Sequence, residues 1–141
     1  MLDLPGIARL IPQQGRMCLL DRVEAWDAGS IRCRTGAHRD LANPLRRDGR
    51  LAAVCMVEPG LQAMALHGAM AAGGPQAQGF VTSLREVEIA MRFADHLPDD
   101  FLAVEATLLA AERQGFVYTF AVRATAGPVC SGQAVIIVPA A

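Results

Sequence analysis

Residues 51–84 read LAAVCMVEPGLQAMALHGAMAAGGPQAQGFVTSL, and this stretch decides the fold. Its first part is rich in Ala, Leu and Met, which favour a helix, and the Gly-Gly-Pro at 73–75 supplies a stop. The sequence therefore predicts one apolar helix over residues 51–72. Pro59 is tolerated only in the first turn of a helix, so the regular helix either begins near Glu58 or kinks there.

Glu58 is the only formally charged residue in this stretch. Burying a carboxylate among apolar side chains is costly unless the group is paired, hydrogen-bonded or protonated. The stretch offers no basic partner, whereas Gln62, four residues later, shares the same helix face. An isolated acid beside an amide is what a proton donor at neutral pH requires. Glu58 is therefore the first candidate for a catalytic residue.

Short strand patterns flank the predicted helix on both sides. Segments 18–26 and 30–38 alternate like a hairpin, after a short helical turn at 4–11. Beyond the helix, four segments predict a meander of antiparallel strands joined by tight turns, namely 79–93, 101–113, 116–125 and 129–139. Strands around a single long helix indicate an α+β fold with the helix packed on one face of the sheet.

The composition favours one globular domain over residues 1–141 and excludes several function classes. The chain is 52% hydrophobic and 19% charged, which is apolar for a monomer of this size and suggests that further surface is buried between subunits. A net charge of −1 without a basic tail argues against nucleic-acid binding. Every basic residue is arginine, so chemistry that needs a lysine, as in a Schiff base or a P-loop, is excluded.

The chain shows no sign of a metal site or a targeting segment. Its cysteines are scattered without close pairs, which predicts buried reduced thiols at Cys18, Cys33, Cys55 and Cys130. The first residues carry Asp3 and lack a signal-peptide pattern, and polar residues inside the apolar helix argue against a membrane span. We therefore expect a cytoplasmic protein without a metal.

Three stretches resemble motifs of one known family. They are IPQQGRMCLLDRV at 11–23, NPL at 43–45 and EPGLQAMALHGA at 58–69. In this order they resemble the 3-hydroxyacyl-acyl-carrier-protein dehydratase family of fatty-acid synthesis, which has the hotdog fold. The loop NPLRRDGRL at 43–51 is most similar to that of the shorter, divergent dehydratase-like proteins of aryl-polyene-type lipid clusters. The resemblance implies an antiparallel sheet wrapped around one long central helix.

The resemblance also implies an activity. The family dehydrates 3-hydroxyacyl thioesters on an acyl carrier protein to trans-2-enoyl thioesters, as a homodimer and without a cofactor. A helix acid of one subunit protonates the departing hydroxide, and a histidine of the other subunit takes the proton alpha to the carbonyl. Glu58 is then the expected general acid and Gln62 its orienting residue. The backbone amides of Gly60 and Leu61 are candidates for stabilising the enolate oxygen.

His38 is the best candidate for the histidine base. It stands five residues before Asn43, whereas the family usually has four, and the Gly-His-Phe-Pro context of the family is missing. A solvated histidine at the end of a strand is the alternative. Asn43 or Asp40 occupies the base position if the loop has been rebuilt.

The other two histidines fit structural roles better. His67 follows Glu58 by nine residues, which places it on the opposite helix face, as a satisfied core or interface residue. His96 stands between strands among acidic residues and is expected at the surface.

Arg46, Arg47 and Arg50 lie in the loop just before the helix. They are candidates for gripping the phosphate of a phosphopantetheine arm or the acidic face of a carrier protein, and a solvated loop is the alternative. Two rival functions remain open. One is an acyl thioesterase that uses the helix acid as a base toward water, and the other is a non-catalytic partner subunit that binds acyl thioesters.

Overall fold

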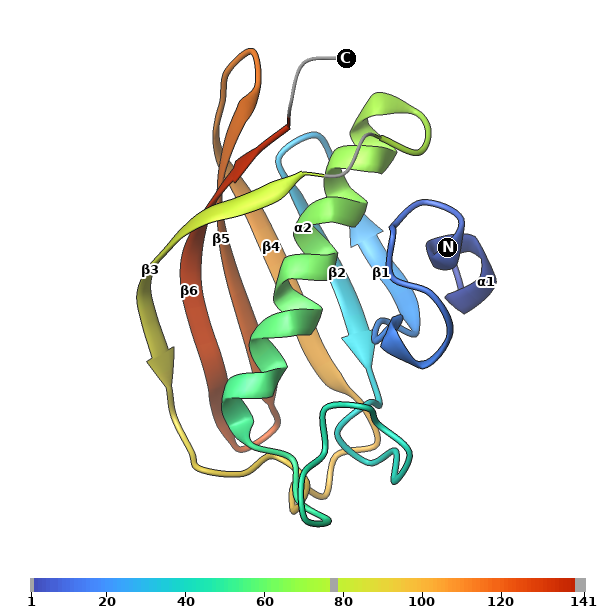
Figure 1. Cartoon of the computed structure of the whole chain (residues 1–141), viewed down its shortest axis with the longest axis vertical. Helices are drawn as coiled ribbons and strands as arrows, with labels where there is room; N and C mark the ends of the chain where they lie inside the picture. The colour runs from blue at the N-terminus through green and yellow to red at the C-terminus, as the bar shows by residue number, and fades with distance from the viewer. Residues whose placement is uncertain (1, 77–78, 139–141) are drawn as a thin grey trace.

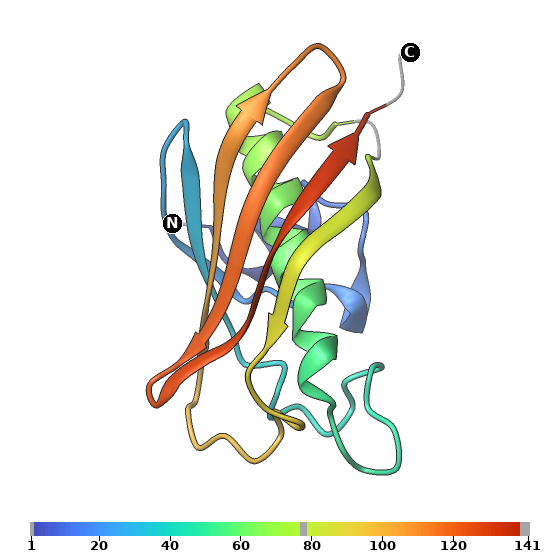
Figure 2. The same cartoon turned by 90° about the vertical axis from the view of Figure 1, so that its left-hand side faces the viewer.

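A curved antiparallel sheet packs against one long helix in the computed structural model, which describes residues 2–76 and 79–138 (Figures 1 and 2). Within these residues the sheet has six strands in the order β1-β2-β4-β5-β6-β3. The strands are β1 Arg22–Trp26, β2 Ser30–Thr35, β3 Phe80–Ile89, β4 Leu102–Ala111, β5 Gly115–Ala124 and β6 Gly127–Ile137. Helix α2 (Val57–Ala72) lies along the face around which the sheet curves, which confirms the predicted α+β fold.

Helix α2 begins at Val57, so the predicted start at residue 51 is wrong. The preceding residues Ala53–Met56 form a short 3-10 helix. The chain just before α2 is instead tied to a neighbouring loop, because the amide of Ala53 donates to the carbonyl of Arg92 over 2.9 Å. Pro59 is the third residue of α2, in the first turn, where a missing amide hydrogen costs nothing. Of the two alternatives for this proline, a helix that begins near Glu58 is the correct one.

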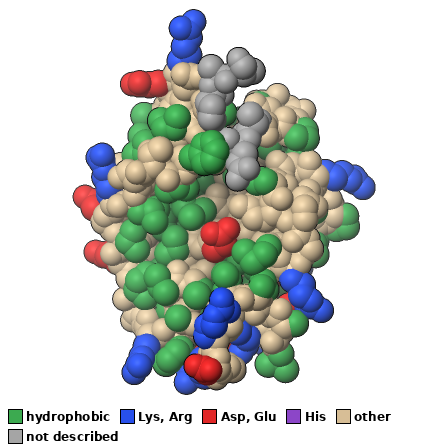
Figure 3. Space-filling model, in the orientation of Figure 1, with side chains coloured by type: hydrophobic (Ala, Val, Ile, Leu, Met, Phe, Trp, Pro, Cys, Tyr) green, Lys and Arg blue, Asp and Glu red, His purple; other side chains and the backbone are tan. Residues whose placement is uncertain are grey.

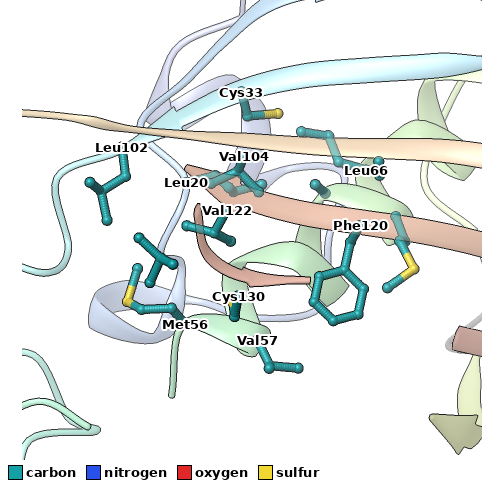
Figure 4. Packing of buried hydrophobic residues seen from close by; sticks show 14 of the residues in the cluster. Leu20, Cys33, Met56, Val57, Leu66, Leu102, Val104, Phe120, Val122 and Cys130 are labelled. Atoms are coloured by element: carbon teal, nitrogen blue, oxygen red, sulfur yellow. The ribbon is translucent and has the colours of Figure 1, made fainter. Parts of the chain in front are cut away.

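Helix α2 ends where the sequence predicts. Gly73 follows its last residue with φ of 84°, in the left-handed region that favours glycine. The helix packs closely on the sheet at its other end, because a Cβ placed on Gly60 would lie 2.6 Å from Cδ2 of Phe120. Phe120 is buried in the main core with Leu66 and Val122 (Figure 4). A glycine at this position therefore allows α2 to approach β5.

Strand β1 begins four residues later than predicted, at Arg22. The earlier residues Cys18–Leu20 are buried, yet they pair with no strand. The backbone of Leu19 bonds to side chains instead: its amide donates to Gln62 and its carbonyl accepts from the Thr35 hydroxyl. Side chains from two other elements thus occupy the groups that a neighbouring strand would use.

Strand β3 lies at the far edge of the sheet, beside β6. The predicted meander instead places this strand next to β4. It pairs with β6, whereas β4 pairs with β2 and β5. Only β4, β5 and β6 follow the chain as a meander, and the loop 90–101 leads from β3 across to β4. A bulge between Arg85 and Glu88 interrupts the pairing of β3, and Glu86 within it has φ of 52°.

The predictions of a short helical turn near the N-terminus and of an irregular arginine-rich loop are confirmed. Helix α1 (Leu4–Ala8) begins with Pro5 in its first turn and is capped by the Asp3 side chain. The arginine-rich segment 39–50 contains no helix and no strand longer than an isolated bridge. Among the described residues, no helix has both the length and the apolar character needed to cross a membrane.

Candidate active site

Glu58 is the second residue of α2 and lies in its first turn. Its side chain is half-buried, while its neighbours Val57 and Pro59 are buried. Glu58 takes part in none of the ion pairs found within residues 2–76 and 79–138. The partial positive charge of a helix N-terminus favours an acid at this position. The expected isolated acid is therefore present, without an arginine to neutralise it.

Gln62 is fully buried and holds Glu58 from one helical turn away. Its Nε2 donates to Oε1 of Glu58 over 3.3 Å and to the carbonyl of Met17 over 2.7 Å. Its Oε1 accepts from the amide of Leu19 over 2.9 Å. If the side-chain amide were reversed, its oxygen would face the Met17 carbonyl and its NH2 group would face the Leu19 amide. These two partners therefore fix Nε2 as the atom that faces Glu58. Oε1 of Glu58 accepts this bond, and the second carboxyl oxygen has no hydrogen-bond partner among the described residues.

His38 lies in the turn after β2 and is fully buried, so the alternative of a solvated histidine is wrong. Its Nε2 lies 2.7 Å from the carbonyl oxygen of Asp99, which can only accept, so Nε2 carries the hydrogen. Its Nδ1 is buried without a hydrogen-bond partner. Burial lowers the pKa of His38 below its usual 6.5, against the opposing effect of the Asp99 carbonyl. The ring is thus neutral at pH 7 with a free lone pair on Nδ1.

His38 and Glu58 make no direct contact by hydrogen bond within the described part of the protomer. The two residues belong to different elements, Glu58 to α2 and His38 to the turn after β2. Their joint action, expected with the base supplied by a second subunit, stays a prediction.

Asn43 and Asp40, the alternatives for the base, both shape the loop. Asn43 is buried, its Nδ2 donates to the carbonyl of Ala37 over 2.9 Å, and its Oδ1 accepts from the amide of Leu45 over 2.9 Å. Asp40 is exposed and accepts from the amide of Ala42 over 2.9 Å. The Asp40 carboxylate and the Asn43 amide both bond within their own loop. His38 is therefore a better candidate for the base than either residue.

Gly60 and Leu61 were predicted to offer free backbone amides. They are the fourth and fifth residues of α2, where the regular i→i−4 pattern assigns each amide to a carbonyl one turn earlier. The amide of Val57, at the start of α2, is also occupied, because it donates to the carbonyl of Val54 in the preceding 3-10 helix. A role for Gly60 and Leu61 in holding an oxyanion stays a prediction.

The loop arginines are largely engaged in the loop itself. Arg46 donates to the carbonyls of Asp40, Gly49 and His38 over 2.8, 3.1 and 3.0 Å. Arg50 pairs with Asp95 over 2.9 Å and stacks on a phenylalanine ring, whereas Arg47 bonds only to carbonyls of its own loop. Arg46 therefore clamps the backbone of His38, and binding of a carrier by these arginines stays a prediction.

His67 and His96 lie where the sequence predicts. His67 is fully buried on α2, with Nδ1 2.8 Å from the Tyr118 hydroxyl and Nε2 2.9 Å from the carbonyl of Asp27. Both ring nitrogens are satisfied, so His67 is a core residue. His96 is exposed.

Thr35 is the residue of this hydrogen-bond network that the sequence reasoning missed. It is fully buried at the end of β2, where its hydroxyl donates to the carbonyl of Leu19 over 2.5 Å and accepts from the amide of Ala37 over 3.1 Å. The available signal was the alternation of β2, which points Ile31, Cys33 and Thr35 inward. A polar residue in that inward series needs a partner in the core.

Two open grooves flank the turn that carries His38. The larger, of about 890 Å³, is lined by Cys18, Leu19 and Ala37 among others, and the smaller, of about 450 Å³, by Arg39 and Arg46 among others. Glu58 lines neither groove. Neither groove therefore provides a binding channel beside Glu58.

Comparison with known protein families matches the sequence of this chain to a named group. The family model "ApeP-like: ApeP dehydratase" matches residues 5–141. The chain belongs to the ApeP-like dehydratase family. Among curated protein sequences, none matches this chain.

Solved structures show that this ApeP-like chain has the hotdog fold. The dehydratase heterocomplex ApeI:P from Xenorhabdus doucetiae contains a chain with a TM-score of 0.79 and 19% identity, over 95% of this chain and 91% of that one. A thioesterase from Haemophilus influenzae has a TM-score of 0.67 and 13% identity, over 99% and 92% of the two chains. A hypothetical thioesterase with coenzyme A from Streptococcus pneumoniae has a TM-score of 0.61 and 15% identity, over 84% of each. At these identities the likeness concerns the fold.

Proposed function

We propose that this ApeP-like protein dehydrates 3-hydroxyacyl thioesters to trans-2-enoyl thioesters, with Glu58 as the general acid. The observation that carries the proposal is a half-buried carboxyl group without a cation, whose Oε1 is held by the buried amide of Gln62. This arrangement leaves the second carboxyl oxygen free to protonate a departing hydroxide. A positioned proton donor of this kind contributes about 100- to 10,000-fold to the rate.

His38 is the proposed base of the same reaction. Its ring is neutral at pH 7 and carries an unpartnered lone pair on Nδ1, so it meets the chemical requirement for taking the alpha proton. It is fully enclosed in the protomer. Access to it requires a rearrangement of the turn that carries it, which we propose accompanies the assembly of two subunits, so that the acid and base of one site belong to different chains.

The surface of β3 supports assembly with a second subunit. This edge strand exposes Phe80, Val81, Leu84 and Val87, each by 38–56%. Figure 3 shows hydrophobic side chains over the left-hand part of that view, where Figure 1 places β3. A long edge strand with apolar side chains and unpaired backbone groups is a liability unless another chain covers it. We propose a homodimer as the simplest assembly.

A dehydration assay tests the proposal. The protein is incubated with 3-hydroxyacyl and with trans-2-enoyl thioesters, and the interconversion is followed by absorbance of the enoyl thioester and by mass spectrometry. Glu58→Gln should lower kcat by at least about 100-fold. Glu112→Gln, at an exposed acid of the β4–β5 turn, is the matched control and should keep full activity. Full activity of Glu58→Gln would refute the assignment, and release of the free acid would indicate a thioesterase instead.

The proposed carrier is an acyl carrier protein, and Arg47 is the residue best placed to meet it. Arg47 is exposed, and its guanidinium bonds only to the carbonyls of Pro44 and Arg46 in its own loop. Arg47→Glu should raise KM for carrier-linked substrate and leave KM for the coenzyme A thioester unchanged. An equal effect on both substrates would exclude recognition of the carrier.

A partner subunit without activity of its own is the second candidate function. Complete burial of His38 supports it, because the isolated protomer presents an acid but no accessible base. The similar structure from Xenorhabdus doucetiae is titled a dehydratase heterocomplex, which makes a mixed assembly a natural alternative. A purified protein that binds acyl thioesters but converts them only after a second hotdog subunit is added would favour this function over the homodimeric enzyme.

A further inference from the structure

A continuous chain of buried hydrogen bonds runs from Glu58 to the turn of His38, and Thr35 stands at its centre. The Thr35 hydroxyl donates to the carbonyl of Leu19 over 2.5 Å and accepts from the amide of Ala37 over 3.1 Å. Both functions of the hydroxyl are thus used, and the side chain is fully buried. No other side chain in the described part of the chain bonds to the Leu19 carbonyl.

On one side, the chain of bonds sets the position of Glu58. The peptide group of Leu19, held at its carbonyl by Thr35, offers its own amide to Oε1 of Gln62 over 2.9 Å. That bond fixes the orientation of the Gln62 amide, whose Nε2 then faces Oε1 of Glu58. Two residues, Leu19 and Gln62, therefore connect Thr35 to Glu58 through successive hydrogen bonds.

On the other side, the chain of bonds reaches the turn of His38. Ala37 is held by Thr35 at its amide and by Asn43 at its carbonyl, the latter over 2.9 Å. The next residue, His38, is held by Arg46 at its carbonyl and by Asp99 at Nε2. Four points thus fix the backbone and ring of two consecutive residues.

We propose that Thr35 is a positioning residue that sets the geometry of both proton-transferring groups from one hydroxyl. The proposal rests on the proposed function, because it concerns the same Glu58 and His38. It adds that the Leu19 peptide transmits the effect to Gln62. Misplacement of a catalytic group by about 1 Å can cost about 100-fold in rate, so a single buried hydroxyl at this place has a large effect.

The test compares three variants of the full-length protein. Thr35→Val keeps the shape of the side chain but removes the hydroxyl, and Thr35→Ser keeps the hydroxyl. Thr107→Val removes a hydroxyl from an exposed position on β4 and is the matched control. We expect Thr35→Val to lower kcat by about 10- to 100-fold with KM within about 2-fold, because transition-state geometry and not substrate binding is disturbed. Thr35→Ser and Thr107→Val should stay within about 3-fold of the original kcat.

A double-mutant cycle separates positioning from a general loss of structure. If Thr35 acts in part through Gln62, Thr35→Val should lower kcat less in the Gln62→Ala background than in the unmodified protein, because the branch to Glu58 is already broken and only the branch to His38 remains. Full additivity of the two effects would overturn the proposal. So would a Thr35→Val variant with the original kcat. If Thr35→Val does not fold, Thr35→Cys, with a weaker donor, takes its place in the same cycle.

A measurement without substrate keeps this proposal distinct from the proposed function. The two Nε2 protons of Gln62 should exchange slowly with solvent in the unmodified protein and in Thr107→Val, and much faster in Thr35→Val, as read by NMR with labelled glutamine. Unchanged exchange in Thr35→Val would refute the role of Thr35 even in an active enzyme. Absence of dehydration by the unmodified protein would refute the proposed function alone, and faster exchange would still support the positioning of Gln62.

Discussion

The amide of Leu19 donates a 2.9 Å hydrogen bond to Oε1 of Gln62, across 43 positions of sequence. This bond joins the segment before β1 to the centre of α2 and orients the amide that faces Glu58. It also uses a backbone group that would otherwise be buried without a partner, since Leu19 is only 4% exposed. Gln62 is thus at once a structural link and the orienting residue of the candidate acid.

Replacing Gln62 by Glu should destabilise the fold at neutral pH. The substitution is nearly isosteric, but it puts a carboxyl oxygen where Nε2 now donates to Met17 and Glu58. A buried charge that meets acceptors instead of donors costs about 3 kcal/mol. Because the protonated form of the introduced carboxyl is a donor again, the loss should shrink as the pH falls from 7 to 5. Urea unfolding at the two pH values measures the change.

Gln114→Glu provides the control for that measurement. Gln114 is exposed in the turn between β4 and β5, so the same substitution there should change the free energy of unfolding by less than about 0.5 kcal/mol at either pH. Equal stability of the Gln62→Glu variant and the unmodified protein at pH 7 would show that Gln62 does not hold the position described.

Two glycines of α2 should respond to alanine in opposite directions. A Cβ on Gly60 would lie 2.6 Å from the Phe120 ring, whereas a Cβ on Gly68 would lie 3.9 Å from the Tyr118 hydroxyl, an ordinary contact. Gly60→Ala should therefore destabilise the protein by about 1–3 kcal/mol through overpacking. Gly68→Ala should stabilise it by up to about 1 kcal/mol through helix propensity. Thermal or urea unfolding of the pair decides, and a stabilising Gly60→Ala would contradict the close approach of α2 to β5.

The sequence pattern predicts which helices and strands form better than it predicts which strands pair with one another. Apolar composition and a glycine stop identify α2, and the lone charge identifies Glu58, because each signal is local. The position of β3 beside β6 is not local: strands of similar pattern can pair in many orders, and the sheet order depends on how the chain crosses α2. The late start of the strand predicted from residue 18 has the same cause, since side chains of Gln62 and Thr35 occupy the Leu19 backbone.

The same distinction between local and long-range signals applies to the residues of the candidate site. Glu58 and Gln62 follow from a four-residue helical spacing, which the chain alone determines. The enclosure of His38 depends on the carbonyl of Asp99, 61 positions away, and no spacing rule connects the two. Thr35 escaped notice because a threonine in a strand is ordinary, and only the burial of its hydroxyl between Leu19 and Ala37 makes it informative.

His38 should make the stability of the fold sensitive to mild acid. Burial lowers the pKa of His38 in the folded protein below the usual 6.5, so the unfolded chain binds this proton more tightly. Stability should therefore fall as the pH drops below about 6.5, with a slope of at most about 1.4 kcal/mol per pH unit for one proton. His38→Gln should flatten this slope, and His96→Gln, at an exposed histidine, should not.

A second acid-sensitive range lies lower and has another cause. Hydrogen bonds from nearby amides hold the pKa of Asp27, Asp95 and Asp99 below their usual 3.8. Their contribution is present above that value and is lost as the pH falls through the lowered pKa. Unfolding measured between pH 7 and 5 thus reports on His38 without these carboxylates. An equal slope in the His38→Gln variant would show that His38 is not buried as described.

The cysteines should differ sharply in reactivity, because thiolate is the reactive form and burial disfavours it. Burial raises the pKa of Cys33 to about 12 and that of Cys130 to about 11, and it raises the pKa of Cys18 as well. Cys55 is half-buried just before α2, with its thiol 3.9 Å from the carbonyl of Leu45.

Iodoacetamide at pH 8 should therefore label Cys55 first in the folded protein, and the buried cysteines only after addition of denaturant. Mass spectrometry of the peptides reads the order, and Cys55→Ser should abolish the early label. Because Cys55 lies three residues before Glu58, labelling it should also slow dehydration; early labelling of Cys33 would instead contradict the packing of β2 against the core.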